Sequence, residues 1–393
     1  MAAGPELEKL REMAFVCNRC GACREKFSAD MTQTPAFRVC PVREHDGGFE
    51  HQCARGKLTI AQAILEGELD YSEELIESIY TDPDCGLCTW VCDSLPVLDP
   101  VAVWRAMKRD IAASDRLPEP LRERDARIRS TRNTFGSKDD RAEWASTLDL
   151  PREGELLYFA GCYASYTQTE IARATIAILR HLGLAPAYLG ELEWCCGVTQ
   201  FDDGSMGLAE EVARHNISAI EASGATRVLT SCAECFKTLK LEYPPLVGNL
   251  SFEVVHTSEF FADLLQEGSL QLDGKLPETR VTFHDPCHLG RHGGVFDPPR
   301  SLLAAIPGVD LVEMERHREY AWCCGYGADL VNSMQPDLAS RISEDRMAEA
   351  RETGAEALVT ACPRCARGLS KAGDGMQVYD LAVALARSLG LSF

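Results

Sequence analysis

The chain of 393 residues repeats one arrangement of cysteines. "EWCCGVTQ" at 193–200 and "AWCCGYGA" at 321–328 each place a tryptophan before two adjacent cysteines and a glycine. The full pattern is Cys-x32-CysCys-x35-Cys-x2-Cys in the first copy and Cys-x35-CysCys-x37-Cys-x2-Cys in the second. An internal repeat of this length predicts a duplicated structural unit. The two sets are Cys162, Cys195, Cys196, Cys232 and Cys235, followed by Cys287, Cys323, Cys324, Cys362 and Cys365.

The segments around these cysteines alternate between strand-like and helical patterns. "ELLYFAGC" and "RVTFHDPC" are strand-like runs that end at a cysteine, and "RVLTSCAEC" and "ALVTACPRC" place each Cys-x2-Cys where a strand passes into a helix. Helical periodicity follows at 168–183, 205–223 and 336–353, and both "FEVVHTSEFFADLL" and "MQVYDLAVALA" predict a closing strand and helix. The fold class is therefore α/β with a mostly parallel sheet, in two tandem domains over 154–270 and 271–393. Ligands of such sheets gather at the carboxyl ends of the strands, where the cysteines stand.

Each repeat offers one thiolate more than a cubane cluster or a zinc ion needs. Two adjacent cysteines cannot easily point at one corner metal of a cube, but they suit a larger and more open cluster. The glycine after each pair removes a Cβ and would let backbone and cluster approach closely.

Eight further cysteines precede residue 93, and their spacing resembles the bacterial ferredoxin run. "CNRCGAC" is followed later by "CP", and "CGLCTWVCD" fits the last three positions of a second run. Asp82 stands where that run lacks its leading cysteine, Cys53 is the spare, and Asp93 stands where proline is usual. The resemblance implies a mostly α-helical, ferredoxin-like domain over 1–104 with two cubane [4Fe-4S] clusters. One would use Cys17, Cys20, Cys23 and Cys92, and the other Cys40, Cys53, Cys85 and Cys88. Four-sulfur zinc sites are the alternative.

Composition and charge narrow the class of protein. The chain contains 18 cysteines and its start lacks the pattern of a signal peptide, so metal ligands are expected rather than disulfides. A net charge of -20 makes nucleic acid an unsuitable partner. No apolar run approaches 18 residues, so we expect a cytoplasmic protein, peripheral to a membrane at most through a partner. GxGxxG does not occur, so flavin or nicotinamide chemistry is expected on a partner.

The charged segment 105–153 contains no cysteine, and we interpret it as a connecting arm that packs on the surface, part helical, with its arginines on a solvated face.

The five-cysteine pattern resembles the CCG domain of heterodisulfide reductases, and both copies match it at every cysteine. With the ferredoxin-like region in front, the chain is similar to the D-type subunit of heterodisulfide reductase, and "NTFGSKDDRAEW" resembles a segment common there. The resemblance implies a noncubane four-iron cluster in each repeat, where a disulfide of thiol cofactors is reduced or formed. It also implies partner subunits, either a flavoprotein or a membrane cytochrome b.

"TFHDPCHLGRHGG" gathers candidate catalytic residues around Cys287. A histidine with a pKa near 6.5 is a suitable proton donor, and His288 is the candidate. Arg291 could hold a sulfonate, phosphate or carboxylate of the substrate. The alternative is that His288 and Asp285 only hydrogen-bond the cluster loop. "YFAGCYASY" in the first repeat has no histidine, so proton handling is expected in the second.

Two functions remain open at this point. The first is an oxidoreductase subunit whose noncubane clusters reduce or oxidise a thiol/disulfide substrate. The second is an electron-relay subunit without its own substrate, in a flavin- or quinone-linked complex such as those of the benzoyl-CoA reductase or lactate/glycolate oxidase type.

Overall fold

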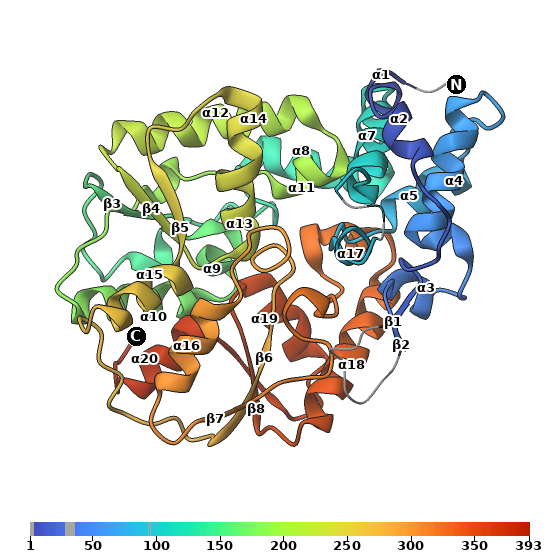
Figure 1. The fold of residues 1–393 in the computed structure, drawn as a ribbon. Coiled ribbons are helices and arrows are strands. Elements are labelled where there is room, and N and C mark those ends of the chain that lie inside the picture. The colour runs from blue at the N-terminus through green and yellow to red at the C-terminus, as the bar shows by residue number, and fades with distance from the viewer. Residues whose placement is uncertain (1–3, 28–35, 93, 95) are drawn as a thin grey trace.

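The computed structural model describes residues 4–27, 36–92, 94 and 96–393. Figure 1 shows the N-terminal region in blue beside the two repeats, which run from green to red. Asp93, on which part of the ferredoxin comparison depends, lies outside the described residues. Over the described ranges, no helix combines the length and the apolar character needed to cross a bilayer.

The N-terminal region is mostly helical. Its elements are α1 (Pro5–Glu8), α2 (Arg11–Phe15), β1 (Glu25–Phe27), β2 (Ala36–Arg38), α3 (Pro41–His45), η1 (Glu50–Gln52), α4 (Ala54–Leu65), α5 (Glu73–Tyr80), α6 (Leu87–Trp90) and α7 (Pro100–Ala113). Strands β1 and β2 form an antiparallel pair. Helix α7 begins where the Asp99 side chain accepts a hydrogen bond from the Val101 N–H and proline takes the first helical position. It buries Trp104, Met107 and Ile111, which share one face, against α4 and its neighbours.

The arm contains α8 (Glu119–Thr131) and η2 (Glu143–Ala145). The expectation of a solvated arginine face holds for Arg122 and Arg129, which are exposed. It is wrong for Arg124 and Arg141, which are 0% and 4% exposed. Each is buried because it has a buried carboxylate partner: Arg124 lies 2.6 Å from Asp203, and Arg141 is paired in the same way within the first repeat. Buried guanidinium groups need such partners.

The first repeat is an α/β layer around a parallel sheet in the order β3-β4-β5. Its elements are β3 (Leu156–Tyr158), α9 (Gly161–Tyr166), α10 (Thr169–His181), η3 (Gly190–Leu192), α11 (Val198–Asp203), α12 (Met206–Ala222), β4 (Arg227–Thr230), α13 (Ala233–Lys237), the π-helical turn η4 (Thr238–Glu242), α14 (Tyr243–Val247), β5 (Glu253–His256) and α15 (Thr257–Gln266).

The second repeat has the same plan with one added edge strand, in the order β7-β6-β8-β9, all parallel. Its elements are β6 (Arg280–His284), α16 (Asp297–Ala305), β7 (Asp310–Val312), η5 (Arg318–Tyr320), η6 (Gly327–Asp329), α17 (Leu330–Met334), α18 (Pro336–Glu352), β8 (Ala357–Thr360), α19 (Pro363–Lys371), β9 (Gln377–Asp380) and α20 (Leu381–Ser388). At the place of β7, the first repeat has an isolated parallel bridge between Leu157 and Ala187. The predicted α/β class, parallel sheets and strand-to-helix position of each Cys-x2-Cys are confirmed.

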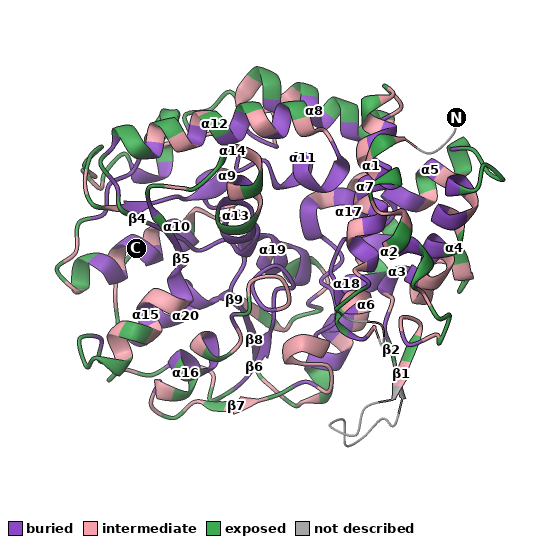
Figure 2. Cartoon of the chain, turned by 45° about the horizontal axis from the view of Figure 1, so that its top comes forward, coloured by how far each residue is buried: buried purple, intermediate pink, exposed green. Residues whose placement is uncertain are grey.

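The two repeats pack on each other reciprocally. Helix α10 of the first repeat contacts α20 of the second, and α15 contacts α16. Each closing helix, α15 or α20, thus packs on the helix of the other repeat that precedes the paired cysteines, α16 or α10. This reciprocal packing relates the repeats by an approximate two-fold axis. In Figure 2 the central strands β6 and β8 are mostly buried, while the outer faces of α8 and α12 are exposed. All four residues of β8 are buried, as expected for a central strand of a parallel sheet covered on both sides.

Candidate metal centre

The five cysteines of the first repeat come from three loops at the carboxyl edge of its sheet, and all are buried. Cys162 follows β3, the adjacent pair precedes α11, and the Cys-x2-Cys joins β4 to α13. The thiol of Cys162 hydrogen-bonds that of Cys195, and Cys235 contacts both Cys196 and Cys232 in the same way. Hydrogen bonds from Cys195 and Cys235 outweigh burial and lower the pKa of Cys196 to about 5.

The second repeat gathers its cysteines in the same manner. Cys323 hydrogen-bonds Cys287, and the thiol of Cys365 donates to Cys324 Sγ at 3.3 Å and also contacts Cys362. The imidazole of His284 joins this group, since its ligand atom and those of Cys324 and Cys365 all lie within 4.8 Å of one another.

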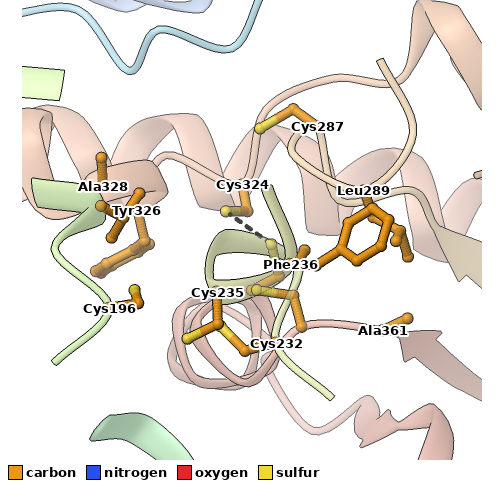
Figure 3. Packing of buried hydrophobic residues seen from close by; sticks show 14 of the residues in the cluster. Cys196, Cys232, Cys235, Phe236, Cys287, Leu289, Cys324, Tyr326, Ala328 and Ala361 are labelled. Carbon is orange, nitrogen blue, oxygen red and sulfur yellow. Dashed lines mark hydrogen bonds between the residues drawn. The ribbon is translucent and has the colours of Figure 1, made fainter. Parts of the chain in front are cut away.

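The two sets meet across the approximate two-fold axis. The thiol of Cys232, from the first repeat, hydrogen-bonds that of Cys362, from the second. Figure 3 shows cysteines of both repeats in one small part of the interior. Ten thiols are thus brought into one continuous buried group. Thiolates are soft ligands that suit iron–sulfur clusters, and iron would compensate the charge that burial otherwise disfavours. This donor set therefore fits iron–sulfur clusters.

Two kinds of glycine shape the site. Gly197 and Gly325, which follow the paired cysteines, have φ of +84° and +81°, a conformation that side chains strain. A Cβ on Gly325 would also lie 2.4 Å from the carbonyl oxygen of Ala339 in α18. Backbone conformation is therefore a second reason for glycine in "WCCG", besides the close approach of a cluster. Gly161, with φ of +72°, is the glycine that approaches a cysteine, since its Cβ would lie 2.8 Å from Cys235 Sγ.

A buried ion pair joins the two Cys-x2-Cys loops. Arg364 Nε lies 2.7 Å from Glu234 Oε2, and the Ala328 N–H donates to Glu234 Oε1 at 2.7 Å. Arg364 also covers the ring of Tyr163 at 4.6 Å. Sequence reasoning missed this pair, although the signal was present: "CAEC" and "CPRC" carry opposite charges at the same position of two related loops.

The N-terminal cysteines form two neighbouring groups. Cys17, Cys20, Cys23 and Cys92 line one small pocket. Near it, Cys53 hydrogen-bonds Cys23. Burial, the charge of Asp82 and, to a smaller extent, the charge of Cys53 raise the pKa of Cys40. Cys88 is half-buried, and its pKa is raised by desolvation and by the charges of Asp82, Cys85 and Cys40. The structure thus brings together the first predicted set and places Cys53 between the two sets. Asp82, at the position of the missing leading cysteine, is buried against the ammonium group of Lys57.

Cys85 reaches beyond its own region. Its thiol hydrogen-bonds Cys323 of the second repeat, which lowers the pKa of Cys85 to about 7 despite burial. The N-terminal cysteines and those of the repeats are therefore in direct contact at this point.

Neither His288 nor Arg291 lies where a substrate site open to solvent would place it. His288 is 2% exposed, with Nδ1 3.9 Å from Glu234 Oε1. Burial lowers the pKa of His288 to about 3, below the value near 6.5 that the sequence suggested, and its role as a proton donor stays a prediction. Arg291 donates to the backbone carbonyls of Cys85, Glu319 and Ala321 at 2.8, 3.2 and 2.6 Å. These contacts describe an arginine that fixes loops around the cysteines.

A basic pocket opens on the other side of the cysteines. Its volume is about 300 Å³, and four cationic side chains line it: Arg127, Arg364, Arg367 and Lys371. Tyr163, which follows Cys162, and Tyr326, which follows Cys324 by two residues, form part of the wall. Arg364 stands between Cys362 and Cys365 in the sequence, so the wall of the pocket includes a residue of a Cys-x2-Cys loop.

Comparison with known proteins agrees with this geometry. The family model "Cysteine-rich domain" (CCG) matches residues 156–240 and 281–370, the two repeats described above. The D-type subunit of the dihydromethanophenazine:CoB--CoM heterodisulfide reductase of Methanosarcina barkeri is 37% identical over 96% of this chain and 94% of its own length. The "EtfAB:quinone oxidoreductase" of Syntrophomonas wolfei is 32% identical over 61% of this chain and 35% of its own length.

The fold and site define an iron–sulfur electron-transfer subunit with a duplicated cysteine-rich domain. More particularly, the chain belongs to the family of the D-type subunits of heterodisulfide reductase. Among solved structures, "Crystal structure of a hypothetical protein from Helicobacter pylori" matches with a TM-score of 0.53 at 11% identity, over 99% of this chain and 72% of that one. That similarity concerns the fold alone.

Proposed function

We propose that the chain is the iron–sulfur oxidoreductase subunit of a heterodisulfide-reductase-like complex. Residues 1–104 would be its ferredoxin-like domain, with cubane [4Fe-4S] clusters on the two predicted cysteine sets. Residues 105–153 would be the arm, and 154–270 and 271–393 the two CCG domains, each with a noncubane [4Fe-4S] cluster. Partners would be other redox subunits, either a flavoprotein or a membrane cytochrome b.

The contact between Cys232 and Cys362 is the observation that carries this proposal. It brings both five-cysteine sets to one place, where a disulfide could meet both at once. Reduction of a disulfide consumes two electrons and two protons and yields two thiols. Iron–sulfur clusters, when bound, would supply the electrons singly. Two adjacent sets therefore suit a two-electron substrate better than one set would.

The basic pocket supports an anionic thiol or disulfide as the substrate. Arg127, Arg367 and Lys371 would attract sulfonate, phosphate or carboxylate groups. Tyr163 and Tyr326 would cover the reacting sulfur atoms and exclude water. Arg291 would act indirectly, since its Nε and Nη1 donate to backbone carbonyls around Cys85 and Cys323. His288, which is neutral and buried, would support the loop of Cys287.

Iron counting and two substitutions test the proposal. Protein purified without oxygen should contain about sixteen irons per chain, from four four-iron clusters. Cys195→Ser and Cys323→Ser should each abolish reduction of an anionic disulfide by reduced viologen dye, while the N-terminal clusters still accept electrons. Unchanged turnover in both variants, or stoichiometric zinc in place of iron, would contradict the proposal.

A second candidate is an electron-relay subunit without its own substrate. It is favoured by the similarity to an EtfAB:quinone oxidoreductase, whose name describes transfer between a flavoprotein and quinone. Reconstitution with candidate partners separates the two functions. A relay would restore electron flow between partners yet reduce no small disulfide, whereas the oxidoreductase would reduce a disulfide when supplied with dye alone.

A further inference from the structure

We propose that the two repeats have different roles: the second receives electrons through Cys85, and Arg141 makes the first the stronger electron acceptor. This inference rests on the proposed function, because it requires an iron–sulfur cluster on each five-cysteine set. The observations that carry it are the different surroundings of the two sets.

The second repeat is fixed to the N-terminal cysteines. The thiol of Cys85 hydrogen-bonds Cys323. Two side chains of the second repeat hold the backbone at this contact: Arg291 donates to the Cys85 carbonyl at 2.8 Å, and His292 donates from Nε2 to the Asp84 carbonyl at 3.0 Å. Electron-transfer rates fall steeply with distance, so an electron from the N-terminal clusters would reach the set of Cys323 first.

The first repeat lies further along the same series of thiols. From Cys323 the contacts lead through Cys324, Cys365 and Cys362 to Cys232, where the series enters the first repeat. They continue through Cys235, Cys196 and Cys195 to Cys162. Cys162 is thus at the far end of the series from Cys85.

A buried cation stands at this far end. Arg141 Nη2 donates to Cys162 Sγ at 3.3 Å, while Nη1 lies 2.7 Å from Glu193 Oε1. Glu193 in turn accepts the N–H groups of Ala160 and Gly161, both at 2.9 Å, at the start of α9. The guanidinium is therefore held against the sulfur by a carboxylate that is itself fixed to the backbone. An arginine guanidinium stays charged in proteins, so this group is a fixed cation beside Cys162.

In the second repeat a neutral imidazole stands between the buried cation and the cysteine sulfur. His284 is buried, and its Nδ1 acts as a hydrogen-bond acceptor and therefore carries no proton, which leaves the ring uncharged. Its Nδ1 accepts from Arg346 Nε at 3.0 Å, and its ring contacts the thiol of Cys324. Arg346 thus acts on a sulfur through an intervening imidazole, whereas Arg141 donates to a sulfur directly.

The consequence for electron transfer follows from charge. A hydrogen bond from a fixed cation to a ligand sulfur stabilises the reduced, more negative state of a cluster and raises its potential. Each transfer moves one electron: the cluster of the second repeat is oxidised by one electron, the cluster of the first is reduced by one, and no atom moves. With dithionite as the reductant, electrons would collect in the first repeat.

The test is a redox titration of the anaerobic, iron-loaded protein followed by electron paramagnetic resonance. Cys162→Ser and Cys287→Ser assign the signals of the two repeats. In the unsubstituted protein, the cluster of the first repeat should become reduced at a higher potential than the cluster of the second. In freeze-quenched samples the second repeat should be reduced first and then pass its electron on. A higher potential in the second repeat would overturn the proposal without any variant at position 141.

Arg141→Met supplies the second readout. At a fixed potential near the midpoint, the ratio of reduced to oxidised cluster in the first repeat should fall about tenfold, equivalent to about 59 mV for one electron. Arg132→Met is the matched control, because Arg132 is a half-exposed cation of the same arm whose side chain pairs with Glu211. If the Arg141→Met protein contains as much iron as the unsubstituted protein and the potential of its first-repeat cluster is unchanged, this inference is overturned, while the proposed function is unaffected. Absence of iron from both repeats of the unsubstituted protein would overturn the proposed function as well.

Discussion

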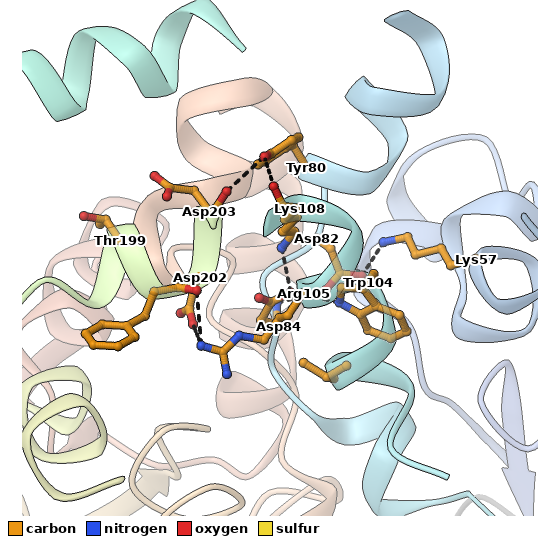
Figure 4. A network of polar contacts seen from close by, with 12 residues as sticks. Lys57, Tyr80, Asp82, Asp84, Trp104, Arg105, Lys108, Thr199, Asp202 and Asp203 are labelled. Carbon is orange, nitrogen blue, oxygen red and sulfur yellow. Dashed lines mark hydrogen bonds and ion pairs between the residues drawn. The ribbon is translucent and has the colours of Figure 1, made fainter. Parts of the chain in front are cut away.

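Asp202 is the residue whose replacement tests how the N-terminal region is attached to the repeats. It is 0% exposed, and its Oδ1 lies 2.9 Å from Lys237 Nζ and 3.1 Å from an Arg105 guanidinium nitrogen. Arg105 comes from α7 and Asp202 from α11, so the contact joins the two parts of the molecule (Figure 4). Burial alone raises the pKa of Asp202, but the charges of Lys237 and Arg105 outweigh it and hold the pKa well below its usual value.

Asp202→Asn removes the charge and keeps the shape. Glu242, 3.0 Å from Arg105 and 3.2 Å from Lys237, would then be the carboxylate shared by both cations. Loss of one partner of a buried ion pair costs about 3–5 kcal/mol. For a chain of 393 residues that unfolds as one unit, an entropy of unfolding of about 2.1 cal/mol/K per residue makes this a fall in Tm of about 4–6 °C. Adding Lys237→Met removes the uncompensated cation, so the double variant should be more stable than Asp202→Asn alone.

Differential scanning calorimetry of the anaerobic, iron-loaded protein measures the effect. The matched control is Glu210→Gln, which breaks a 2.7 Å pair with Arg214 on the exposed face of α12. That pair contributes at most about 0.5 kcal/mol, so its loss should shift Tm by less than about 1 °C. If Asp202→Asn lowers Tm no more than Glu210→Gln does, the reasoning from burial is refuted.

Three further tests use substitutions elsewhere in the chain. His256 is neutral in the folded state because burial lowers its pKa from 6.5 to about 4, so the folded state binds fewer protons than the unfolded state between these values. Stability should therefore fall by up to about 3 kcal/mol as the pH falls from 6.5 to 4. His256→Asn, which keeps a good N-cap for α15, should flatten this decline in Tm against pH; an unchanged slope would contradict it. Gly161→Ala should lower both Tm and iron content, since its φ is +72° and a Cβ would lie 2.8 Å from a thiol; the left-handed backbone alone costs about 1–2 kcal/mol. Gly183→Ala, with φ of +74° and nothing within 4 Å, should lower Tm but leave the iron content unchanged, and equal iron loss in both would be evidence against a specific contact. Arg367→Gln combined with Lys371→Gln should raise KM for an anionic disulfide about tenfold or more and leave kcat for an uncharged one unchanged, and an equal effect on both substrates would contradict a charge-selective pocket.

The architecture of the repeats followed from local patterns. A cysteine placed directly after an apolar, β-branched run and before a helical pattern identifies the carboxyl end of a parallel strand, and "RVLTSCAEC" and "ALVTACPRC" each adopt that structure. The sequence did not predict the edge strand β7, because Asp310–Val312 is too short to be distinguished from a loop. Nor did it predict that Arg124 and Arg141 are buried, since charge patterning cannot tell a solvated arginine from one with a buried partner.

The sequence by itself determined which residues could bind metal, because five thiols at matching positions of two related units have few other uses. Only the tertiary structure decided how those sets are arranged. The approximate two-fold packing of α10 on α20 and α15 on α16 brings Cys232 to Cys362, and the fit of the N-terminal region brings Cys85 to Cys323. Both of these thiol contacts, Cys232 with Cys362 and Cys85 with Cys323, join residues more than 100 positions apart. They depend on the shapes and charges of whole surfaces, such as Arg105 of α7 against Asp202 of α11, which no local pattern encodes.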